Sequence, residues 1–217
     1  MKFIALTIAV LAAAAVIRKL LRYKTLYPLL PRKYNFGKRR NTLREVMRLL
    51  EQRGAKTLVE TGVARQGLKR TKGDGASTVV FALWSKAHGA NLFSVDIDPD
   101  AIATARRTLE EMDLSSAVHL KASDSVAFLA AFEQPVDFLY LDSYDYHRTD
   151  TSIQQASQKH HLDEFRAIEK QLHDASVVLI DDCNLPAGGK GKRVIEYMLT
   201  KGWYVHLFEY QALLVRK

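Results

Sequence analysis

The chain contains 217 residues, of which 47% are hydrophobic and 26% charged, and this length suits one α/β domain with a sizeable core rather than two. Its only cysteine, Cys183, excludes an intramolecular disulfide framework and favours a reducing compartment. The formal net charge of +8 suggests nucleic acid, an anionic membrane surface or an acidic substrate as a partner. Because much of the basic excess lies near the N-terminus and no zinc-finger or RNA-binding motif is present, we expect no nucleic-acid partner.

Residues 1–24 form the most apolar segment of the chain. From Phe3 to Ile17 the run contains apolar and small residues, and Thr7 is its only polar member. A spanning helix usually needs about 20 apolar residues, but two further leucines extend the run before a basic cluster. We therefore predict an N-terminal hydrophobic helix that anchors the protein to a membrane. The positive-inside rule then places the C-terminal domain on the cytoplasmic side.

Two alternatives remain for this segment. The small residues Ala12–Ala15 could provide the cleavage site of a signal peptide, in which case the protein is exported. The segment could also be an amphipathic or buried helix. Residues 25–40 contain two prolines and further basic side chains, which indicates a linker, and residues 41–217 are expected to form the main domain.

Apolar runs and helical patterns alternate along the rest of the chain. Helices are expected at residues 41–53 with Asn41 as N-cap, 77–88, 100–112, 123–132, 162–172 and 193–200. Strands are expected at residues 57–61, 91–96, 117–121, 136–141 and 176–181, and then at 203–208 and 212–216. The alternation predicts a parallel sheet covered by helices on both faces. The last two strands are so close in sequence that they can pair only as an antiparallel hairpin.

Polar residues follow the first predicted strand, at the edge where ligands bind in an open α/β sheet. The strand runs into Glu60, Thr61 and Gly62, and a glycine-rich segment at 73–77 precedes the next helix. Glycine lets the backbone approach a ligand, and a helix N-terminus favours anionic groups. The spacing matches neither the dinucleotide fingerprint nor the P-loop.

The second and third predicted strands also end in candidate ligands. Asp96 ends the second strand, where a carboxylate can accept both hydrogen bonds of a ribose diol. Asp98 is placed to cap the next helix, with Pro99 in its first turn. After the third strand, Ser123 or Asp124 could contact an adenine amino group or cap the following helix.

These segments resemble a known superfamily. The order V-E-T-G, G-A-S-T, V-D-I-D-P, A-S-D-S and D-F-L-Y-L-D is similar to that of the class I S-adenosylmethionine (SAM)-dependent methyltransferases, over about residues 56–216. The resemblance implies a Rossmann-like, doubly wound α/β sheet of seven strands, five parallel plus a C-terminal antiparallel hairpin. It also implies that the SAM site is lined by Glu60, Gly62, Gly75, Ser77, Asp96, Ser123 and Asp124. A doubly wound domain without SAM is the alternative.

A second set of carboxylates follows the fourth and fifth strands. Asp142 comes after the fourth strand, and Asp181 and Asp182 come at the end of the fifth. Neighbouring parallel strands would bring them together, and packed like charges raise one another's pKa or recruit a cation. Oxygen ligands suit Mg²⁺, which would help a bound hydroxyl lose its proton. Otherwise the aspartates are solvated loop or cap residues.

This set resembles two groups of methyltransferases. The catechol and caffeoyl-coenzyme A O-methyltransferases have an Asp after strand four and an Asp-Asn pair after strand five. The macrocin-type sugar O-methyltransferases have an Asp-Asp pair, which Asp181 and Asp182 match better. The catechol type also has a lysine three positions after its strand-four Asp, where this chain has Asp145. We therefore expect Asp142 or His147 to act as the base.

Two segments are expected to overhang this edge. The polar residues 146–161 could form a substrate lid or supply metal ligands. The basic, glycine-rich loop 186–193 could bind an anionic group of the substrate through backbone N–H groups and lysine, or could simply be solvated. Together these features predict a membrane-associated SAM-dependent O-methyltransferase that acts, with Mg²⁺, on a small-molecule hydroxyl. The alternatives are a metal-independent methyltransferase and a non-catalytic, methyltransferase-like binding domain.

Overall fold

The computed structural model describes residues 7, 10–17, 36–69, 71–74 and 76–216, and the chain divides into two compact units, Met1–Lys33 and Tyr34–Lys217. In the first unit, residues 10–17 are helical. The rest of the predicted N-terminal helix, apart from Thr7, lies outside the described residues, as do residues 25–35 of the predicted linker.

The prediction of a membrane-associated protein is wrong for the part of the chain that the structure describes. No helix in that part is both long enough and apolar enough to cross a membrane.

The second unit is built on one mixed sheet. Among the described residues its strands are β1 (Thr57–Thr61), β2 (Asn91–Asp96), β3 (Val118–Ala122), β4 (Val136–Leu141), β5 (Leu172–Ile180), β6 (Trp203–Phe208) and β7 (Ala212–Arg216). The strand order is β3-β2-β1-β4-β5-β7-β6. Strands β1 to β5 pair in parallel, and β7 is antiparallel to both β5 and β6. The predicted fold class, a seven-stranded Rossmann-like sheet with a C-terminal hairpin, is therefore confirmed.

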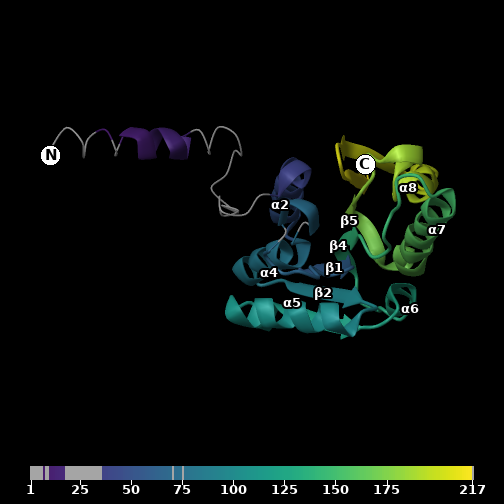
Figure 1. The fold of residues 1–217 in the computed structure, drawn as a ribbon, viewed down its shortest axis with the longest axis horizontal. Helices are drawn as coiled ribbons and strands as arrows, with labels where there is room; N and C mark the ends of the chain where they lie inside the picture. Colours follow the sequence, from purple (N-terminus) through teal and green to yellow (C-terminus); the bar gives the residue numbers. More distant parts are fainter. Residues whose placement is uncertain (1–6, 8–9, 18–35, 70, 75, 217) are drawn as a thin grey trace. The chain divides into compact units, whose positions relative to one another are not determined.

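Helices cover both faces of the sheet (Figure 1). The helices are α2 (Arg40–Arg53), α3 (Thr71–Asp74), α4 (Ser77–His88), α5 (Pro99–Glu111), α6 (Ser125–Ala130), α7 (Thr151–Ile168) and α8 (Lys192–Leu199). Short 3-10 turns are η1 (Gly37–Arg39), η2 (Ser115–Ala117), η3 (Glu169–Gln171) and η4 (Pro186–Gly188). One face is covered by α2, α4 and α5, and the other by α6, α7 and α8.

Local sequence explains several of these boundaries. Helix α2 ends at Gly54, whose φ of +63° is a left-handed conformation that glycine adopts readily. Helix α5 begins after Asp98, whose side chain accepts a hydrogen bond from the backbone N–H of Asp100, and Pro99 is its first residue. These are the start and stop signals expected from the sequence.

Helix α7 differs most from its predicted bounds. It begins at Thr151 rather than at Leu162, so most of the polar segment 146–161 is helical and not a lid-like loop. Asp150 starts the helix, because its carboxylate accepts hydrogen bonds from the backbone N–H groups of Ser152 and Ile153 at 2.9 and 3.2 Å. The polar composition hid this helix, whereas its N-cap residue determines where it begins.

Candidate active site

The register of the central strands aligns their carboxyl ends. Thr61 of β1 lies opposite Leu141 of β4, which lies opposite Ile180 of β5. The pairing continues one step further, because the N–H of Asp142 donates to the Thr61 carbonyl and the N–H of Asp181 to the Leu141 carbonyl, both at 3.1 Å. The residues that follow the three strands therefore form a row at one edge of the sheet.

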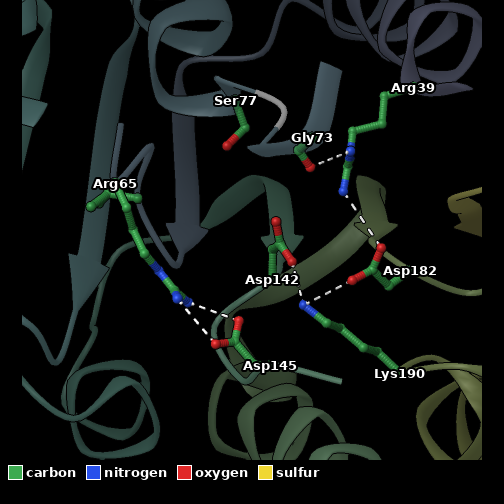
Figure 2. A pocket seen from close by; sticks show the side chains of 9 residues that line it. Arg39, Arg65, Gly73, Ser77, Asp142, Asp145, Asp182 and Lys190 are labelled. Atoms are coloured by element: carbon green, nitrogen blue, oxygen red, sulfur yellow. Dashed lines mark hydrogen bonds and ion pairs between the residues drawn. The ribbon is translucent and has the colours of Figure 1, made fainter. Parts of the chain in front are cut away.

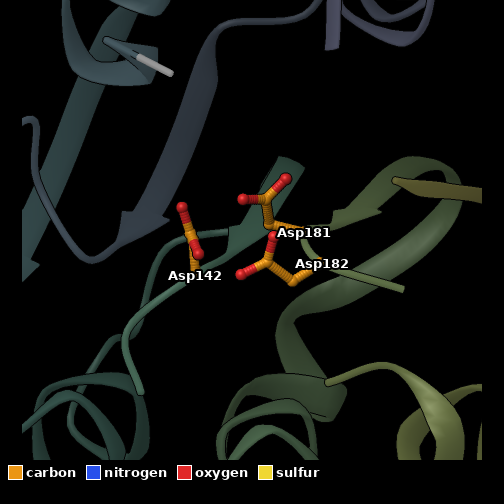
Figure 3. Close-up of side chains that lie close together, drawn as sticks. All are labelled: Asp142, Asp181 and Asp182. Atoms are coloured by element: carbon orange, nitrogen blue, oxygen red, sulfur yellow. The ribbon is translucent and has the colours of Figure 1, made fainter. Parts of the chain in front are cut away.

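Asp142, Asp181 and Asp182 come together in this row (Figure 3). Each offers a carboxylate oxygen within 4.8 Å of those of the other two. Asp181 is fully buried, and Asp142 and Asp182 are partly buried. The sequence thus correctly indicated that these carboxylates would meet, while their chemical role stays a prediction. We call them the aspartate cluster.

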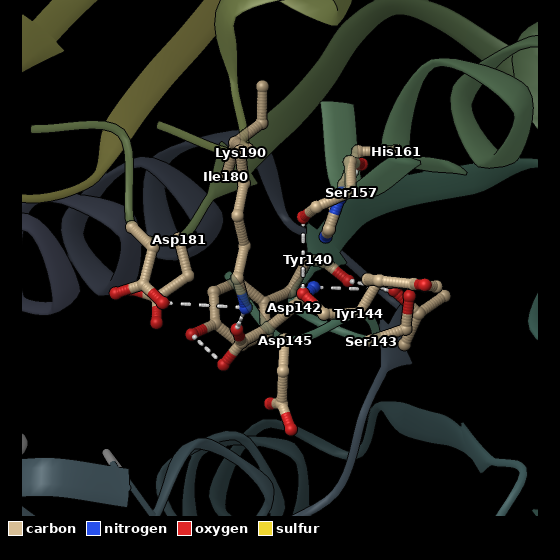
Figure 4. Close-up of polar contacts among 12 residues, drawn as sticks. Tyr140, Asp142, Ser143, Tyr144, Asp145, Ser157, His161, Ile180, Asp181 and Lys190 are labelled. Atoms are coloured by element: carbon tan, nitrogen blue, oxygen red, sulfur yellow. Dashed lines mark hydrogen bonds and ion pairs between the residues drawn. The ribbon is translucent and has the colours of Figure 1, made fainter. Parts of the chain in front are cut away.

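Two cationic side chains are inserted into the aspartate cluster. The Arg39 guanidinium donates to the Asp181 carboxylate from Nε at 2.9 Å and from Nη2 at 2.5 Å. The Lys190 ammonium donates to Asp142 at 2.5 Å and lies 3.5 Å from Asp182 (Figures 2 and 4). Arg39 and Lys190 are themselves buried, so two of the three negative charges are balanced from within the protein.

This arrangement shifts the proton affinities of its members. Burial, followed by the charge of Asp181, raises the pKa of Asp142 well above its usual range. Burial also tends to raise the pKa of Asp181, but the charge and hydrogen bonds of Arg39 outweigh it and hold that pKa below its usual value. For Lys190, burial is outweighed by the surrounding carboxylates, and its pKa is raised. Lys190 is therefore a persistent cation, and Asp142 is a more basic carboxylate than usual.

A chain of buried hydrogen bonds orients Asp142. The Tyr140 hydroxyl donates to Asp142 Oδ2 at 3.2 Å, and Gln211 Nε2 donates to the Tyr140 hydroxyl at 3.3 Å. The other end of Gln211, Oε1, accepts a hydrogen bond from the Thr42 hydroxyl of α2. This chain of hydrogen bonds thus holds Oδ2 of Asp142 in place. The other oxygen, Oδ1, accepts the hydrogen bond from Lys190.

A small cavity of about 100 Å³ opens onto the aspartate cluster (Figure 2). It is lined by Arg39, Val63, Arg65, Gly73, Ser77, Asp142, Asp145, Asp182 and Lys190. Arg65 and Asp145 form a two-bonded ion pair across it, at 3.1 Å for each bond. Ligand pockets usually enclose about 300–1,000 Å³, so this cavity by itself is smaller than a usual ligand pocket. We call it the reaction cavity.

Two of the predicted cofactor residues are buried acids. Glu60 is fully buried in β1, accepts a hydrogen bond from the Ser94 hydroxyl at 2.7 Å, and has a pKa raised to about 7 by burial. Asp96, at the end of β2, accepts hydrogen bonds from the backbone N–H groups of Val63 at 3.0 Å and Asp98 at 2.9 Å. Asp96 therefore ties the loop after β1 to the end of β2, and a carboxylate has further lone pairs for a ligand.

The glycine-rich loop supplies other predicted contacts. Gly62 has a φ of +81°, and a Cβ atom there would lie 2.6 Å from the Asp142 carbonyl oxygen. This close approach of two strand ends requires glycine. Ser77 begins α4, is buried and lines the reaction cavity. Gly75 lies outside the described residues.

The predicted adenine contacts lie after β3. The Ser123 N–H donates to the Asp96 carbonyl at 3.0 Å. Asp124 is exposed and caps α6, because its carboxylate accepts from the Ala127 N–H at 2.8 Å. The helix-cap alternative is thus the role that the contacts of Asp124 support.

The structure does not bring His147 into the aspartate cluster. His147 is exposed, and its Nδ1 accepts a hydrogen bond from the Asp150 N–H at 3.0 Å. It is not among the residues that line the reaction cavity. Its catalytic role stays a prediction that none of these contacts supports.

The glycine-rich loop 186–193 is held in place by hydrogen bonds that its sequence did not predict. Gln158 of α7 donates to the carbonyls of Ala187 and Gly189 at 3.0 and 3.1 Å. Lys190 points inward to the aspartate cluster, so it is not available as a solvated anion ligand.

Arg39 and Lys190 are members of the site that the sequence did not predict. Arg39 lies in a basic run that was interpreted as a linker, and Lys190 lies between glycines in a loop interpreted either as an anion-binding loop or as solvated. A signal was available, because three carboxylates predicted to meet in a core require compensating cations. Nothing in the local sequence distinguishes these two basic residues from their neighbours.

The fold and the row of acidic residues at the ends of β1, β2 and β4 define a class I SAM-dependent methyltransferase. A family model described as a methyltransferase domain matches residues 72–183, which is more than half of the chain, and the protein belongs to this family. It is therefore an enzyme that takes SAM as cofactor.

Solved structures share this fold. A presumed caffeoyl-CoA O-methyltransferase from Staphylococcus aureus matches with a TM-score of 0.59 and 15% identity, over 94% of this chain and 91% of that one. The SAH-bound methyltransferase PaMTH1 of Podospora anserina gives 0.58 and 14%, over 94% and 88%. An O-methyltransferase from Bacillus cereus in complex with SAH gives 0.56 and 16%, over 81% of each chain. A comparison with curated protein sequences gave no match.

Proposed function

We propose that this methyltransferase methylates a hydroxyl group of a small molecule, with the reaction at the aspartate cluster. The observation that carries the proposal is the placement of Asp142. Its carboxylate lines the reaction cavity, and its backbone lies against Gly62 in the loop after β1. We further propose that the SAM site lies at the same edge of the sheet and is lined by Glu60, Gly62, Gly75, Ser77, Asp96, Ser123 and Asp124.

The proposed reaction is a direct transfer. The hydroxyl oxygen of the acceptor attacks the methyl carbon of SAM, a C–O bond forms, and the C–S bond breaks to leave neutral S-adenosylhomocysteine. The hydroxyl proton passes to the carboxylate of Asp142, a general-base role suited to a carboxylate of raised pKa. Lys190 keeps Asp142 in place and compensates the charge of the cluster.

The Mg²⁺-assisted form of this proposal is less well supported than the metal-independent form. The aspartates supply the oxygen ligands that Mg²⁺ prefers. However, the Lys190 ammonium already lies between the carboxylates of Asp142 and Asp182, and the Arg39 guanidinium is hydrogen-bonded to the carboxylate of Asp181. A divalent ion here would lie beside the buried cations Arg39 and Lys190. The net charge of the three aspartates and these cations would then change from negative to positive. The residues present therefore do not fit a resident Mg²⁺, and we favour a reaction without it.

The boundary of the catalytic domain follows from the same contacts. We propose that the methyltransferase domain comprises the predicted residues 41–217 together with the turn η1. Arg39 of this turn is buried against Asp181, so the turn belongs to the proposed reaction site.

The test uses the full chain, SAM and a set of hydroxyl-bearing small molecules, with S-adenosylhomocysteine formation as the readout. With an accepted hydroxyl compound, Asp142→Asn should lower kcat by about 10²- to 10⁴-fold, the range for loss of a general base, and leave SAM affinity unchanged. The control is Asp113→Asn, because Asp113 is exposed and remote in sequence from the cluster. Normal turnover in Asp142→Asn would contradict the base role.

The same assay separates the alternatives. Full activity in the presence of chelator supports the metal-independent form, and activity lost to chelator and restored by Mg²⁺ supports the metal-assisted form. SAM binding without turnover of any hydroxyl compound would contradict O-methylation and favour the non-catalytic binding domain.

A further inference from the structure

A second cavity adjoins the reaction cavity. It has a volume of about 360 Å³, within the usual range for small-molecule sites. The lining residues are Gly37, Lys38, Arg39, Lys72, Gly73, Arg148 and Tyr210. Arg39 and Gly73 line both cavities, and the Arg39 guanidinium donates to the Gly73 carbonyl at 3.1 Å. The two cavities thus share this wall, and we call the second one the basic cavity.

The basic cavity carries an excess of positive charge. Four of its lining residues are Lys or Arg, and none of its lining residues within the described chain is acidic. Arg39 is neutralised by Asp181. Lys38, Lys72 and Arg148 are exposed and form no ion pair with any of the acidic side chains that the structure describes, a set that does not include Asp74. Their uncompensated charges attract an anion.

Tyr210 connects the basic cavity to the aspartate cluster. The Lys38 ammonium and the Arg39 guanidinium lie over its ring, at 5.4 and 4.8 Å from the ring centre. Its backbone carbonyl accepts hydrogen bonds, at 2.9 and 3.3 Å, from the N–H groups of Cys183 and Asn184, which directly follow Asp182. A group bound in the basic cavity would therefore be separated from the aspartate cluster, where we place the reaction, only by residues such as Tyr210.

We propose that the basic cavity binds an anionic group, a phosphate or a carboxylate, of the methyl acceptor. This proposal rests on the proposed function, because it takes the hydroxyl group of the same molecule to lie at Asp142. The acceptor is then a small hydroxyl compound with a negative charge. Lys72 and Arg148, from α3 and from the loop after β4, contribute the charges that hold it.

The first experiment titrates inorganic phosphate into the full chain, with and without saturating S-adenosylhomocysteine, at constant ionic strength, and repeats it with citrate and with single-stranded RNA. Lys72→Met and Arg148→Met should each weaken anion binding at least about fivefold, because each removes one of the charges that hold the anion. Lys170→Met and Arg106→Met are the matched controls, because both residues are exposed elsewhere, and they should leave the dissociation constant unchanged. Tighter binding of phosphate or of citrate identifies the anion class.

Three outcomes would overturn the proposal. The first is the absence of binding of either anion, or an equal loss in the control variants. The second is phosphate binding that S-adenosylhomocysteine abolishes, since the cavity would then hold the carboxylate of the cofactor. The third is tight binding of single-stranded RNA that depends on Lys72 and Arg148, which would make the cavity part of a nucleic-acid surface.

A second experiment separates this inference from the proposed function. Hydroxyl compounds with a phosphate or carboxylate are compared with neutral analogues as methyl acceptors in the wild type and in Arg148→Met. A KM for the anionic acceptor that rises in the variant, with an unchanged KM for the neutral one, supports the inference. Turnover of neutral compounds alone overturns the inference and leaves the proposed function standing. Phosphate binding without any methyl transfer supports the anion site and contradicts the proposed function.

Discussion

Arg39 and Asp181 are 142 positions apart in the sequence, and their side chains meet in a buried, two-donor ion pair. Arg39 lies just before the first helix of the sheet domain, whereas Asp181 follows its fifth strand. Arg39 also contacts Gly73 and the ring of Tyr210. The start of the domain is therefore tied directly to its candidate active site.

Removing one partner of this pair should be costly. Arg39→Met leaves the Asp181 carboxylate buried without its main partner, and we expect the free energy of unfolding to fall by about 3–5 kcal/mol. Urea denaturation measures this. The control Arg48→Met, which breaks a partly exposed pair with Glu45, should cost less than about 1 kcal/mol. Equal stability of Arg39→Met and Arg48→Met would mean that the buried Arg39–Asp181 pair matters no more for stability than a partly exposed one.

The double variant Arg39→Met/Asp181→Leu distinguishes loss of the pair from loss of packing. Because it removes both charges, it should recover much of the stability lost in Arg39→Met. A double variant less stable than the single one would contradict this explanation.

Two glycines with left-handed conformations should respond differently to substitution. Gly189 has a φ of +59°, and a Cβ atom there would lie 2.0 Å from the Asp182 carbonyl oxygen. Gly54 has a φ of +63° with no atom within 4 Å of such a Cβ. We expect Gly54→Ala to cost about 1 kcal/mol of backbone strain, and Gly189→Ala to cost several times more and to displace Asp182. Thermal unfolding of both variants measures the contrast, and equal melting temperatures would contradict it.

Glu60 should make stability depend on pH. Its pKa rises from about 4.5 when unfolded to about 7 when folded, so the folded carboxyl keeps its proton to higher pH than the unfolded one. The stability it contributes is therefore fully present below pH 4.5 and is lost as pH rises to 7. Glu60→Gln does not ionise, so its unfolding free energy relative to wild type should rise by about 3 kcal/mol between pH 4 and pH 8.

Urea denaturation without cofactor at several pH values tests this prediction. Glu51→Gln is the matched control, because Glu51 is exposed on α2, and its difference from wild type should change little. A pH-independent difference for Glu60→Gln would mean that the buried carboxyl does not hold its proton.

Asp96 should control cofactor affinity. Asp96→Ala removes the acceptor for the Val63 and Asp98 N–H groups as well as the proposed ribose ligand. We expect calorimetric titration to show SAM binding weakened about 5- to 150-fold, equivalent to about 1–3 kcal/mol. Asp100→Ala, at an exposed position in the first turn of α5, should bind like the wild type. Unchanged affinity in Asp96→Ala would remove Asp96 from the SAM site.

Much of the sheet could be predicted from the sequence. Strands β1, β2 and β4 have the bounds that the sequence predicted, because a strand buried on both faces is mostly apolar. Strand β5 begins at Leu172 rather than Ser176, since its first residues are polar and the pairing that extends it is tertiary. For helix α7 the polar first half gave no periodic signal, and Asp150 alone marked its start.

Only the acidic residues of the candidate site could be predicted from the sequence. Asp142, Asp181 and Asp182 follow strands whose order places them together, so the fold alone predicts their meeting. Arg39 and Lys190 reach the same place from segments whose course depends on tertiary contacts, such as those of Gln158 with the 186–193 loop. Charge compensation predicts that some cation is present, but local sequence does not identify which one.

The position of β7 affects the order in which the enzyme can be completed during translation. β7 (Ala212–Arg216) lies between β5 and β6, with Ala212 opposite Ile180. While the ribosome still holds residues 212–216, the strand that leads into Asp181 has an unpaired edge and β6 has no neighbour in the sheet. The nascent chain can therefore pair β1 to β4 early, whereas β5 gains its second neighbour only after residues 212–216 are synthesised. A premature stop codon between residues 182 and 212 would leave the strand before Asp181 paired with β4 alone.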